Sequence, residues 1–225
     1  MYPVLVGAFD ISSAWYRIVQ AVLEKGVKQK LQAYDEYALT VYNLLVHIEH
    51  PEIRPMACAE AGYTEKMLWD YWANYFFIGV DSEHAHSYAK RLKEPVDQYQ
   101  LVANMLRETP YSRRAVMVIS KPEDLLSEYA PCVRELNFYC LPPDYDRVNL
   151  TVMMRSWDVY SAGNPDLASF QMANEMVAKL ADKETGALTV LATNAHIYKR
   201  TLEVLAAKKK DDNHKTFLQV MKEVK

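Results

Sequence analysis

The 225 residues are long enough for a substantial core, and we expect a single domain over residues 1–225. Half of the residues are hydrophobic and the net charge is only -3, which argues against a disordered chain and against a surface that binds nucleic acid. No apolar run is long enough to span a membrane, and the N-terminus lacks the features of a signal peptide, so we expect a cytoplasmic protein.

Helical patterns dominate the first half of the chain. A helix capped by Ser12 or Ser13 is expected to run to about residue 25, with apolar side chains at helical spacing. Residues 37–47 are rich in β-branched and aromatic side chains, which favours a strand, although a helix is also compatible with them. The aromatic residues 65–77 predict a largely buried helix, and residues 97–108 predict an amphipathic one.

The second half of the chain is more strand-like. Apolar runs predict strands over residues 115–120, 136–141, 148–155 and 188–193. A long helix is predicted over residues 167–180, between the last two of these strands. Because helices and strands are interspersed and several strands are adjacent in the sequence, we predict an α+β fold.

The three cysteines, Cys58, Cys132 and Cys140, are odd in number and have no Cys-x-x-Cys spacing, so neither a disulfide framework nor a structural zinc site is expected. Cys58 and Cys140 are interpreted as small packed hydrophobic residues. No metal site is predicted, because four histidines lack carboxylate or cysteine partners at the spacing of metal ligands: His47, His50, His84 and His86.

Cys132 differs from the other two cysteines because arginines lie on both sides of it in the chain. Arg113 and Arg114 precede it, and Arg155 follows one strand-length later. Guanidinium groups bind phosphate oxygens, and a cluster of them lowers the pKa of a nearby thiol. With Asp166 as a downstream acid, these residues suggest nucleophilic attack on a ring that is carried by a phosphate ester.

The candidate residues occur in five short strings whose order and spacing resemble the thymidylate synthase superfamily. The resemblance covers about residues 96–205, roughly half of the chain, and the order of the five strings is more specific than any one of them. It implies a thymidylate synthase-like mixed sheet packed with helices and a homodimer formed through the sheet face. The strings are Tyr111-Ser112-Arg113-Arg114, Pro131-Cys132, Arg155-Ser156-Trp157-Asp158, Asp166-Leu167-Ala168-Ser169-Phe170 and His196-Ile197-Tyr198.

The resemblance also implies a chemistry for Cys132. In this family a cysteine adds to C6 of a pyrimidine nucleoside monophosphate, and C5 then attacks the one-carbon unit of 5,10-methylenetetrahydrofolate, the co-substrate. Cys132 would be the nucleophile. Arg155 would bind the nucleotide phosphate and help to keep the thiol ionised, and Ser156 would add a hydrogen bond to the phosphate.

Further roles follow from the same resemblance. Arg113 and Arg114 would reach the phosphate in the neighbouring subunit's site, which makes a homodimer the active form. Asp158 would contact the pterin ring of the folate. His196 and Tyr198 would hold a hydroxyl group of the sugar.

Asp166 departs from the family in an informative way. Counting forward from Arg155 and back from Ser169 places it where thymidylate synthases have an Asn that donates to O4 of uracil and accepts from N3–H. An ionised carboxylate only accepts, which suits the exocyclic amine of cytosine and a protonated N3. The same exchange marks the deoxycytidylate and cytidylate hydroxymethylases of the superfamily. Alternatively, Asp166 simply caps the helix predicted from residue 167.

A buried Glu usually positions the key water in this family. Glu65 is the candidate for that role and Glu60 the second choice, and a plain helix-start carboxylate is the alternative for Glu65. Two further departures, Val133 and Met154 where the family usually has His and Gln, put ordinary thymidylate synthesis in doubt.

The leading hypothesis is therefore a folate-dependent C5-hydroxymethylase that acts on dCMP or CMP. The alternative is a short, divergent thymidylate synthase that methylates dUMP to dTMP. A third hypothesis, a nucleotide-binding protein without turnover, conflicts with the presence of both Cys132 and Arg155.

Overall fold

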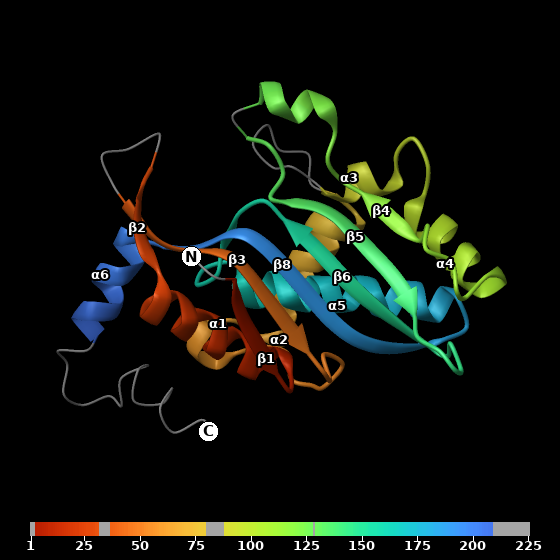
Figure 1. Ribbon diagram of the computed structural model, residues 1–225, viewed down its shortest axis with the longest axis horizontal. Coiled ribbons are helices and arrows are strands. Elements are labelled where there is room, and N and C mark those ends of the chain that lie inside the picture. The colour runs from red at the N-terminus through yellow and green to blue at the C-terminus, as the bar shows by residue number, and fades with distance from the viewer. Residues whose placement is uncertain (1–2, 32–36, 80–87, 128, 209–225) are drawn as a thin grey trace.

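The computed structural model describes residues 3–31, 37–79, 88–127 and 129–208. A mixed sheet with the strand order β1-β3-β8-β6-β5-β4 lies at its centre, with β2 paired to β3 and β7 paired to β8 (Figure 1). The strands are β1 (Val4–Ala8), β2 (Val27–Lys30), β3 (Tyr37–Ile48), β4 (Val116–Val118), β5 (Val133–Cys140), β6 (Arg147–Met154), β7 (Trp157–Asp158) and β8 (Glu184–Tyr198).

The pairing directions make this sheet mixed. β8 runs antiparallel to β3 on one side and parallel to β6 on the other, whereas β5 runs antiparallel to both β6 and β4. The helices are α1 (Ile11–Lys25), α2 (Glu65–Trp72), α3 (Tyr88–Lys93), α4 (Gln98–Glu108), α5 (Gly163–Leu180) and α6 (Lys199–Lys208). The predicted α+β class is confirmed.

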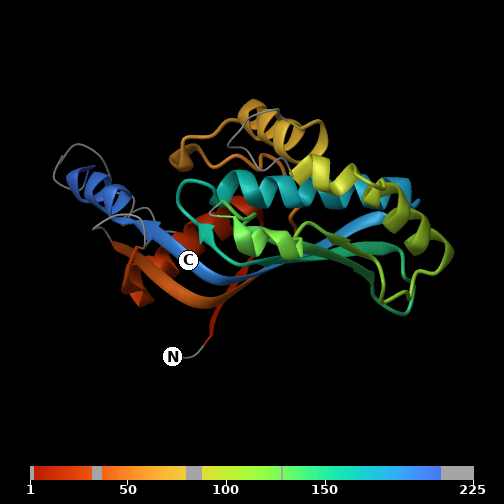
Figure 2. The same cartoon turned by 90° about the horizontal axis from the view of Figure 1, so that it is seen from above.

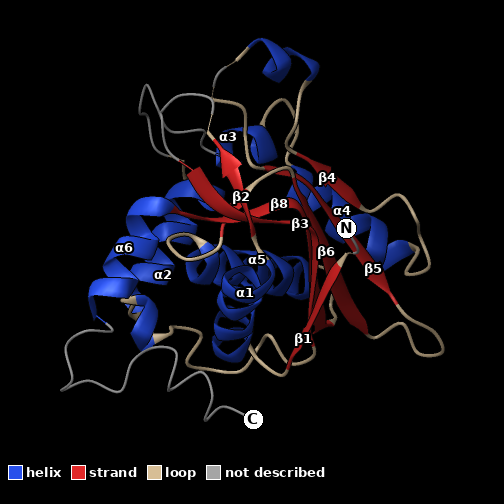
Figure 3. Cartoon of the chain, turned by 60° about the vertical axis from the view of Figure 1, so that its left-hand side comes forward, coloured by secondary structure: helices blue, strands red, loops and turns tan. Residues whose placement is uncertain are grey.

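The helices α1, α2 and α5 lie together on one side of the sheet (Figures 2 and 3). In Figure 2 the opposite face carries none of the helices in the described ranges. The burial of the central strands agrees with this layering. Val46, Val190 and Val152 are fully buried, whereas their chain neighbours Leu45 and Leu191, which point to the other face, remain partly accessible.

Helix α5 occupies the middle of the helical layer and is buried on nearly every side. It begins at Gly163, four residues before the predicted start, because Pro165 is tolerated in the first turn of a helix. The N-cap is Ala162, so the interpretation of Asp166 as a helix cap is wrong. Asp166 instead lies inside the first turn with its side chain in the protein interior.

Two other predictions differ from the structure at element ends. Helix α1 is capped by Asp10 and not by Ser12 or Ser13: the Asp10 side chain accepts from the Ser13 amide at 2.7 Å, and the Ser13 hydroxyl accepts from the Asp10 amide. Strand β8 is far longer than the predicted residues 188–193, because it pairs along its length with β3 and β6.

The remaining predicted elements are present. Residues 37–47 form the strand β3, and residues 97–108 form α4 with Asp97 as its N-cap. The aromatic helix 65–77 is α2 continued by a π-helical segment, η2 (Ala73–Phe77), but only Leu68 and Phe76 in it are buried, so the prediction of a largely buried helix is wrong. Sequence patterns missed the strands β1, β2 and β7 and the helices α3 and α6. Within the described ranges, no helix combines the length and the apolarity that crossing a membrane requires.

Candidate active site

The sheet brings Cys132 and Arg155 together. Cys132 lies directly before β5 and Arg155 directly after its antiparallel partner β6, and the Arg155 amide donates to the Cys132 carbonyl at 2.9 Å. The Arg155 guanidinium holds the loop before the thiol, since Nε donates to the Pro131 carbonyl at 3.0 Å and Nη2 donates to the Ala130 carbonyl. Nη1 forms no hydrogen bond with the described residues and remains available for an anion.

The electrostatics of the thiol differ from the prediction. Burial raises the pKa of Cys132, and the carboxyl of Asp166 raises it further, while the guanidinium of Arg155 acts in the opposite direction. The effect of burial on the pKa of the thiol is larger than the effect of Arg155. Within a single chain the pKa is therefore raised, and the predicted lowering is wrong. The two other arginines of the predicted cluster lie too far along the sheet to contribute.

Arg113 and Arg114 lie at the opposite end of β5 from Cys132. They precede Ala115, whose carbonyl accepts from the amide of Phe138, six residues beyond the nucleophile candidate. At about 3.3 Å per residue this corresponds to roughly 20 Å along the strand. Both arginine side chains are exposed, and neither forms an ion pair with another residue in the described ranges.

Asp166 is buried beside the thiol, with only 5% of its surface exposed. Its Oδ1 accepts from the Tyr71 hydroxyl at 3.0 Å, and its Oδ2 accepts from Nε1 of Trp157 at 3.0 Å. Burial raises the pKa of Asp166 to about 7, although both hydrogen bonds act to lower it. The side chain can therefore exchange a proton near neutral pH.

Tyr71 belongs to helix α2, which packs against α5, the helix that carries Asp166. The N-cap of α2 is Thr64, whose hydroxyl accepts from the Met67 amide at 3.3 Å. Leu68, one helical turn before Tyr71, is fully buried, so this face of α2 packs inward. The predicted aromatic helix thus places a phenol against Asp166, a role that no pattern in the sequence indicated.

Tyr88 is a second residue that sequence analysis missed. It begins α3, and its phenol oxygen lies against the backbone amides of Cys132 and Val133. The pKa of Tyr88 is raised by burial first and then by the charges of Asp166 and Cys132, which places all three groups in one site. A lone tyrosine far from the other motifs gives no sequence signal for such a contact.

The folate candidate Asp158 lies on β7, and the sugar candidates His196 and Tyr198 lie on β8. Strand β7 pairs with β8 so that Asp158 stands opposite His196, and the rings of His196 and Tyr198 meet edge to face with centroids 4.7 Å apart. His196 is 6% exposed, and neither ring nitrogen finds a hydrogen-bond partner among the described residues. Burial lowers the pKa of His196, so a neutral imidazole with two unsatisfied nitrogens faces the site.

The two glutamate candidates have other partners. The Glu65 carboxylate accepts from the amide of Ala57 at 2.6 Å, which fixes the segment before α2. Glu60 is exposed and interacts with Tyr16 and with the thiol of Cys58. The structure therefore brings neither carboxylate into hydrogen-bond contact with Asp166, and Tyr71 occupies that place.

Ser156 lies between Arg155 and Trp157 in a half-buried position, and it has no hydrogen bond to the residues that the structure describes. No three His, Cys, Asp or Glu side chains cluster as metal ligands within these residues. His84 and His86 lie outside the described residues.

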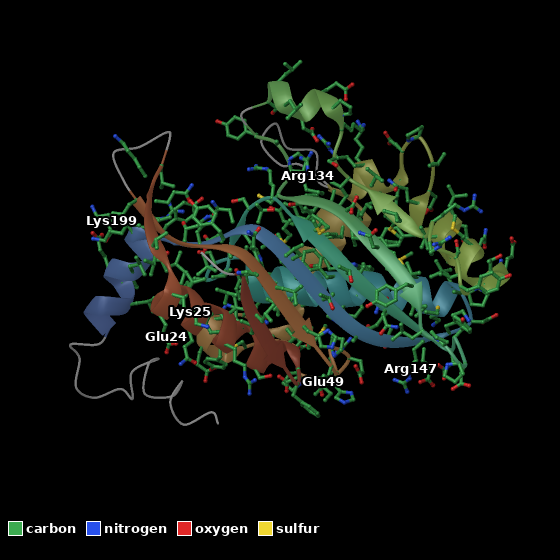
Figure 4. All side chains as sticks on the ribbon, viewed as in Figure 1. Glu24, Lys25, Glu49, Arg134, Arg147 and Lys199 are labelled. Carbon is green, nitrogen blue, oxygen red and sulfur yellow. The ribbon has the colours of Figure 1, made fainter. Side chains whose placement is uncertain are left out.

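A buried ion pair fixes the loop that leads to Cys132. Arg91 of α3 forms two hydrogen bonds of 2.7 and 2.9 Å with Asp124 of η3 (Pro122–Leu126) and a third with the Ile119 carbonyl. Arg134, labelled in Figure 4 at the start of β5, lies 3.9 Å from the same carboxylate. Together these charges hold the pKa of Asp124 at about 2, and the hydrogen bond from Arg91 is the largest cause.

We expect Asp124→Asn to lower the free energy of unfolding by about 2–3 kcal/mol at neutral pH, because Arg91 then lacks its ionic partner. The folded pKa of Asp124 lies below its ordinary value of 3.8. The stabilisation is therefore complete above that value and is lost as the pH falls through about 2. Urea unfolding of both proteins measures the difference, and the exposed neighbour Glu123→Gln serves as control. A loss below about 0.5 kcal/mol, the range of ordinary surface substitutions, would contradict this prediction.

Comparisons with known proteins place the chain among relatives. The family described as "Thymidylate synthase" matches residues 60–223. A protein of Methanosarcina mazei named "Putative thymidylate synthase" is 28% identical over 202 residues, which cover 86% of this chain and 89% of that protein. The thymidylate synthase of Bacillus subtilis subsp. natto is 27% identical over 148 residues, which cover 61% of this chain and 50% of that enzyme.

The family match includes the part of the chain in which the site lies, from Tyr71 to Tyr198. It also includes the strands β4 to β8 and helix α5, so the mixed sheet with its layer of helices is the thymidylate synthase fold. The chain belongs to the thymidylate synthase family, whose members transfer a one-carbon unit from methylenetetrahydrofolate to a pyrimidine nucleotide.

Proposed function

We propose that the protein converts dCMP, or CMP, into its 5-hydroxymethyl derivative. The Cys132 thiolate adds to C6 of the base, C5 bonds to the one-carbon unit of the folate, and the C5 proton leaves. Tetrahydrofolate departs, water adds to the exocyclic methylene group, and the thiolate is eliminated. The folate supplies the carbon of the new hydroxymethyl group and water supplies its hydroxyl, so the reaction requires no oxidant or reductant.

The buried carboxyl of Asp166 is the observation that carries this proposal. Each of its oxygens receives one hydrogen bond from the protein, which leaves a second lone pair on each for the base. Cytosine offers its exocyclic amine and, once protonated, N3–H to two such acceptors. The proton that N3 requires during the attack at C6 is available from a carboxyl whose pKa is about 7.

The rest of the pocket supports a nucleoside monophosphate. The free Nη1 group of Arg155 suits a phosphate close to the thiol. The two unsatisfied nitrogens of His196 suit a sugar hydroxyl, which both donates and accepts hydrogen bonds. The Asp158 carboxylate beside them offers acceptors to the amino and ring N–H groups of a pterin.

Thymidylate synthesis from dUMP is the second candidate, and the raised pKa of Asp166 is the observation that favours it. A neutral carboxylic acid presents one O–H donor and one acceptor, which is the pattern that O4 and N3–H of uracil require. In that case the methylene group takes a hydride from the folate, which leaves as dihydrofolate.

Release of tritium from the 5-position tests both candidates. Labelled dCMP, CMP and dUMP are each incubated with methylenetetrahydrofolate while the absorbance of dihydrofolate is followed. Release from a cytidine nucleotide without formation of dihydrofolate supports the hydroxymethylase. Release from dUMP together with dihydrofolate would overturn it in favour of thymidylate synthesis.

We further propose that the active form is a dimer in which Arg113 and Arg114 bind the phosphate in the partner's site. Two observations support this arrangement. The arginines lie roughly 20 Å along β5 from the thiol of their own chain. Leu45, Leu191 and Met153, aligned across β3, β8 and β6, remain partly accessible on the sheet face that lacks helices.

A verified heterodimer of an Arg114→Ala subunit and a Cys132→Ala subunit should recover about half of the wild-type activity, because one of its two sites has both residues intact. Each variant alone should be inactive. Co-expression with two different affinity tags isolates the heterodimer for the tritium assay. The matched control pairs Arg114→Ala with a doubly substituted Arg114→Ala/Cys132→Ala subunit and should stay inactive. A heterodimer no more active than this control would contradict shared sites.

A further inference from the structure

The two oxygens of Asp166 have chemically different partners. Oδ2 is 3.0 Å from Nε1 of Trp157, and this indole N–H can only donate. Oδ1 is 3.0 Å from the hydroxyl of Tyr71, which can donate a hydrogen bond or accept one. Trp157 is 1% exposed and belongs to the short strand β7, so its donor has little freedom to turn away.

This difference restricts where a neutral Asp166 can carry its proton. The hydroxyl oxygen of a carboxylic acid is a poor acceptor, so a proton on Oδ2 would leave the buried N–H of Trp157 without a good partner. A proton on Oδ1 has no such cost, because the Tyr71 hydroxyl can reorient. The neutral acid therefore presents Oδ2 as the acceptor and Oδ1 as the donor.

We propose that Trp157 is a positioning residue that confines the proton of Asp166 to Oδ1, where the Tyr71 hydroxyl tolerates it, and that this fixed polarity determines which pyrimidine base the site accepts. The inference rests on the proposed role of Asp166 in reading the base. Cytosine needs the acid proton opposite N3, whereas uracil needs it opposite O4. If only one oxygen of the carboxyl can carry the proton, the side chain pairs correctly with one of the two bases and mismatches the other.

Several titratable groups surround Asp166 and enter its pH dependence. Asp158 of β7 raises its pKa by repulsion, and the thiol of Cys132 interacts with its charge. The phenols of Tyr63, Tyr71 and Tyr88 face it from the segment before α2, from α2 and from α3. Burial is the largest cause that raises the pKa of each of these phenols and of the thiol, and the charge of Asp166 raises each pKa further. All four groups therefore stay protonated while Asp166 titrates near neutral pH.

The test measures nucleotide binding in a Cys132→Ala background, where no thiol titrates and no covalent adduct forms. Dissociation constants of dCMP and dUMP are determined by calorimetry between pH 5.5 and 9. Trp157→Phe should reduce the ratio of the two affinities by about tenfold, because either oxygen can then carry the proton. Tyr71→Phe should keep the ratio, since Trp157 still holds Oδ2.

The pH profile provides the second readout. Binding should weaken as the pH rises through about 7, where Asp166 loses the proton that it shares with the base. Tyr71→Phe removes a hydrogen bond that stabilises the ionised form of Asp166. The pH at which binding weakens should therefore rise by about one unit. Tyr75→Phe removes a phenol whose ring packs 4.7 Å from that of Tyr71 and serves as the matched control with an unchanged profile.

The outcomes separate this inference from the proposed function. If the parent protein prefers dCMP and Trp157→Phe leaves the ratio unchanged while remaining folded, the fixed polarity is wrong and the substrate proposal stands. If the parent protein prefers dUMP and Trp157→Phe narrows that preference, the substrate proposal is wrong and the fixed polarity stands. If Trp157→Phe fails to fold, the pH profile of Tyr71→Phe decides alone. Binding that weakens at the same pH in Tyr71→Phe as in the parent protein would overturn the inference.

Discussion

Replacing Cys132 with Ala is expected to reduce turnover by at least about a thousandfold while the protein still binds nucleotide. The C6 adduct needs a thiolate, and of the three cysteines only Cys132 has a pKa on which the Arg155 guanidinium acts. Tritium release measures the loss, and calorimetric titration with dCMP measures binding. The methyl side chain of Ala leaves the backbone hydrogen bond to Arg155 intact, so the phosphate contact should survive.

Cys140→Ala is the matched control, since Cys140 is at the far end of the same strand and is 8% exposed. It should keep nearly full activity at the cost of some stability, because it removes a small buried side chain. Turnover that survives in Cys132→Ala, or is lost equally in both variants, would exclude Cys132 as the nucleophile.

The charges of Cys132 and Asp166 are coupled, and this coupling bears on the chemistry. Asp166 is buried and Cys132 is partly buried, and an ionised Asp166 raises the pKa of the thiol. The site therefore disfavours a thiolate and a carboxylate together, and a neutral Asp166 makes the thiolate easier to form. That is the combination that attack at C6 requires, with a nucleophilic sulfur and a proton held next to N3. In the proposed dimer, Arg113 and Arg114 of the partner subunit would further favour the thiolate.

Much of the fold follows from local patterns in the sequence. Apolar periodicity located α1, α4 and the strands β3, β5 and β6, because each buries one face against the sheet or the helical layer. The short strands β1 and β2 were missed, since they are defined by pairing to β3 rather than by a pattern of their own. The helix start at Gly163 was missed because Gly and Pro in the first turn resemble a loop.

The site was predictable only where a motif carried it. Cys132, Arg155, Asp158 and His196 were recognised from the order of five strings, and the structure brings them to one end of the sheet. The contacts of Asp166 were not predicted, because Tyr71 is 95 residues away in the chain and donates its hydrogen bond from another helix. No local pattern encodes a contact between residues so distant in sequence.

Asp166→Asn is expected to shift substrate preference from cytidine towards uridine nucleotides by about a hundredfold in the ratio of kcat/KM values. An amide presents a donor to O4 and an acceptor to N3–H of uracil at every pH, whereas it cannot give up the proton that N3 of cytosine requires during the attack at C6. Competition between dCMP and dUMP in the tritium assay measures the ratio. Glu175→Gln, the same change further along α5, is the matched control and should leave the ratio as it is.

The same substitution has a signature in stability that an aspartate with an ordinary pKa would not produce. Burial raises the folded pKa of Asp166 to about 7, above its ordinary value of 3.8, so the wild-type protein loses stability as the pH rises between these two values. Asn cannot ionise, and the variant should therefore gain about 4 kcal/mol relative to the wild type between pH 4 and pH 8, which is about 1.4 kcal/mol for each unit of the raised pKa. Urea unfolding at both pH values measures the gain. A variant with an unchanged substrate ratio and no such gain would show that Asp166 neither reads the base nor holds a proton at neutral pH.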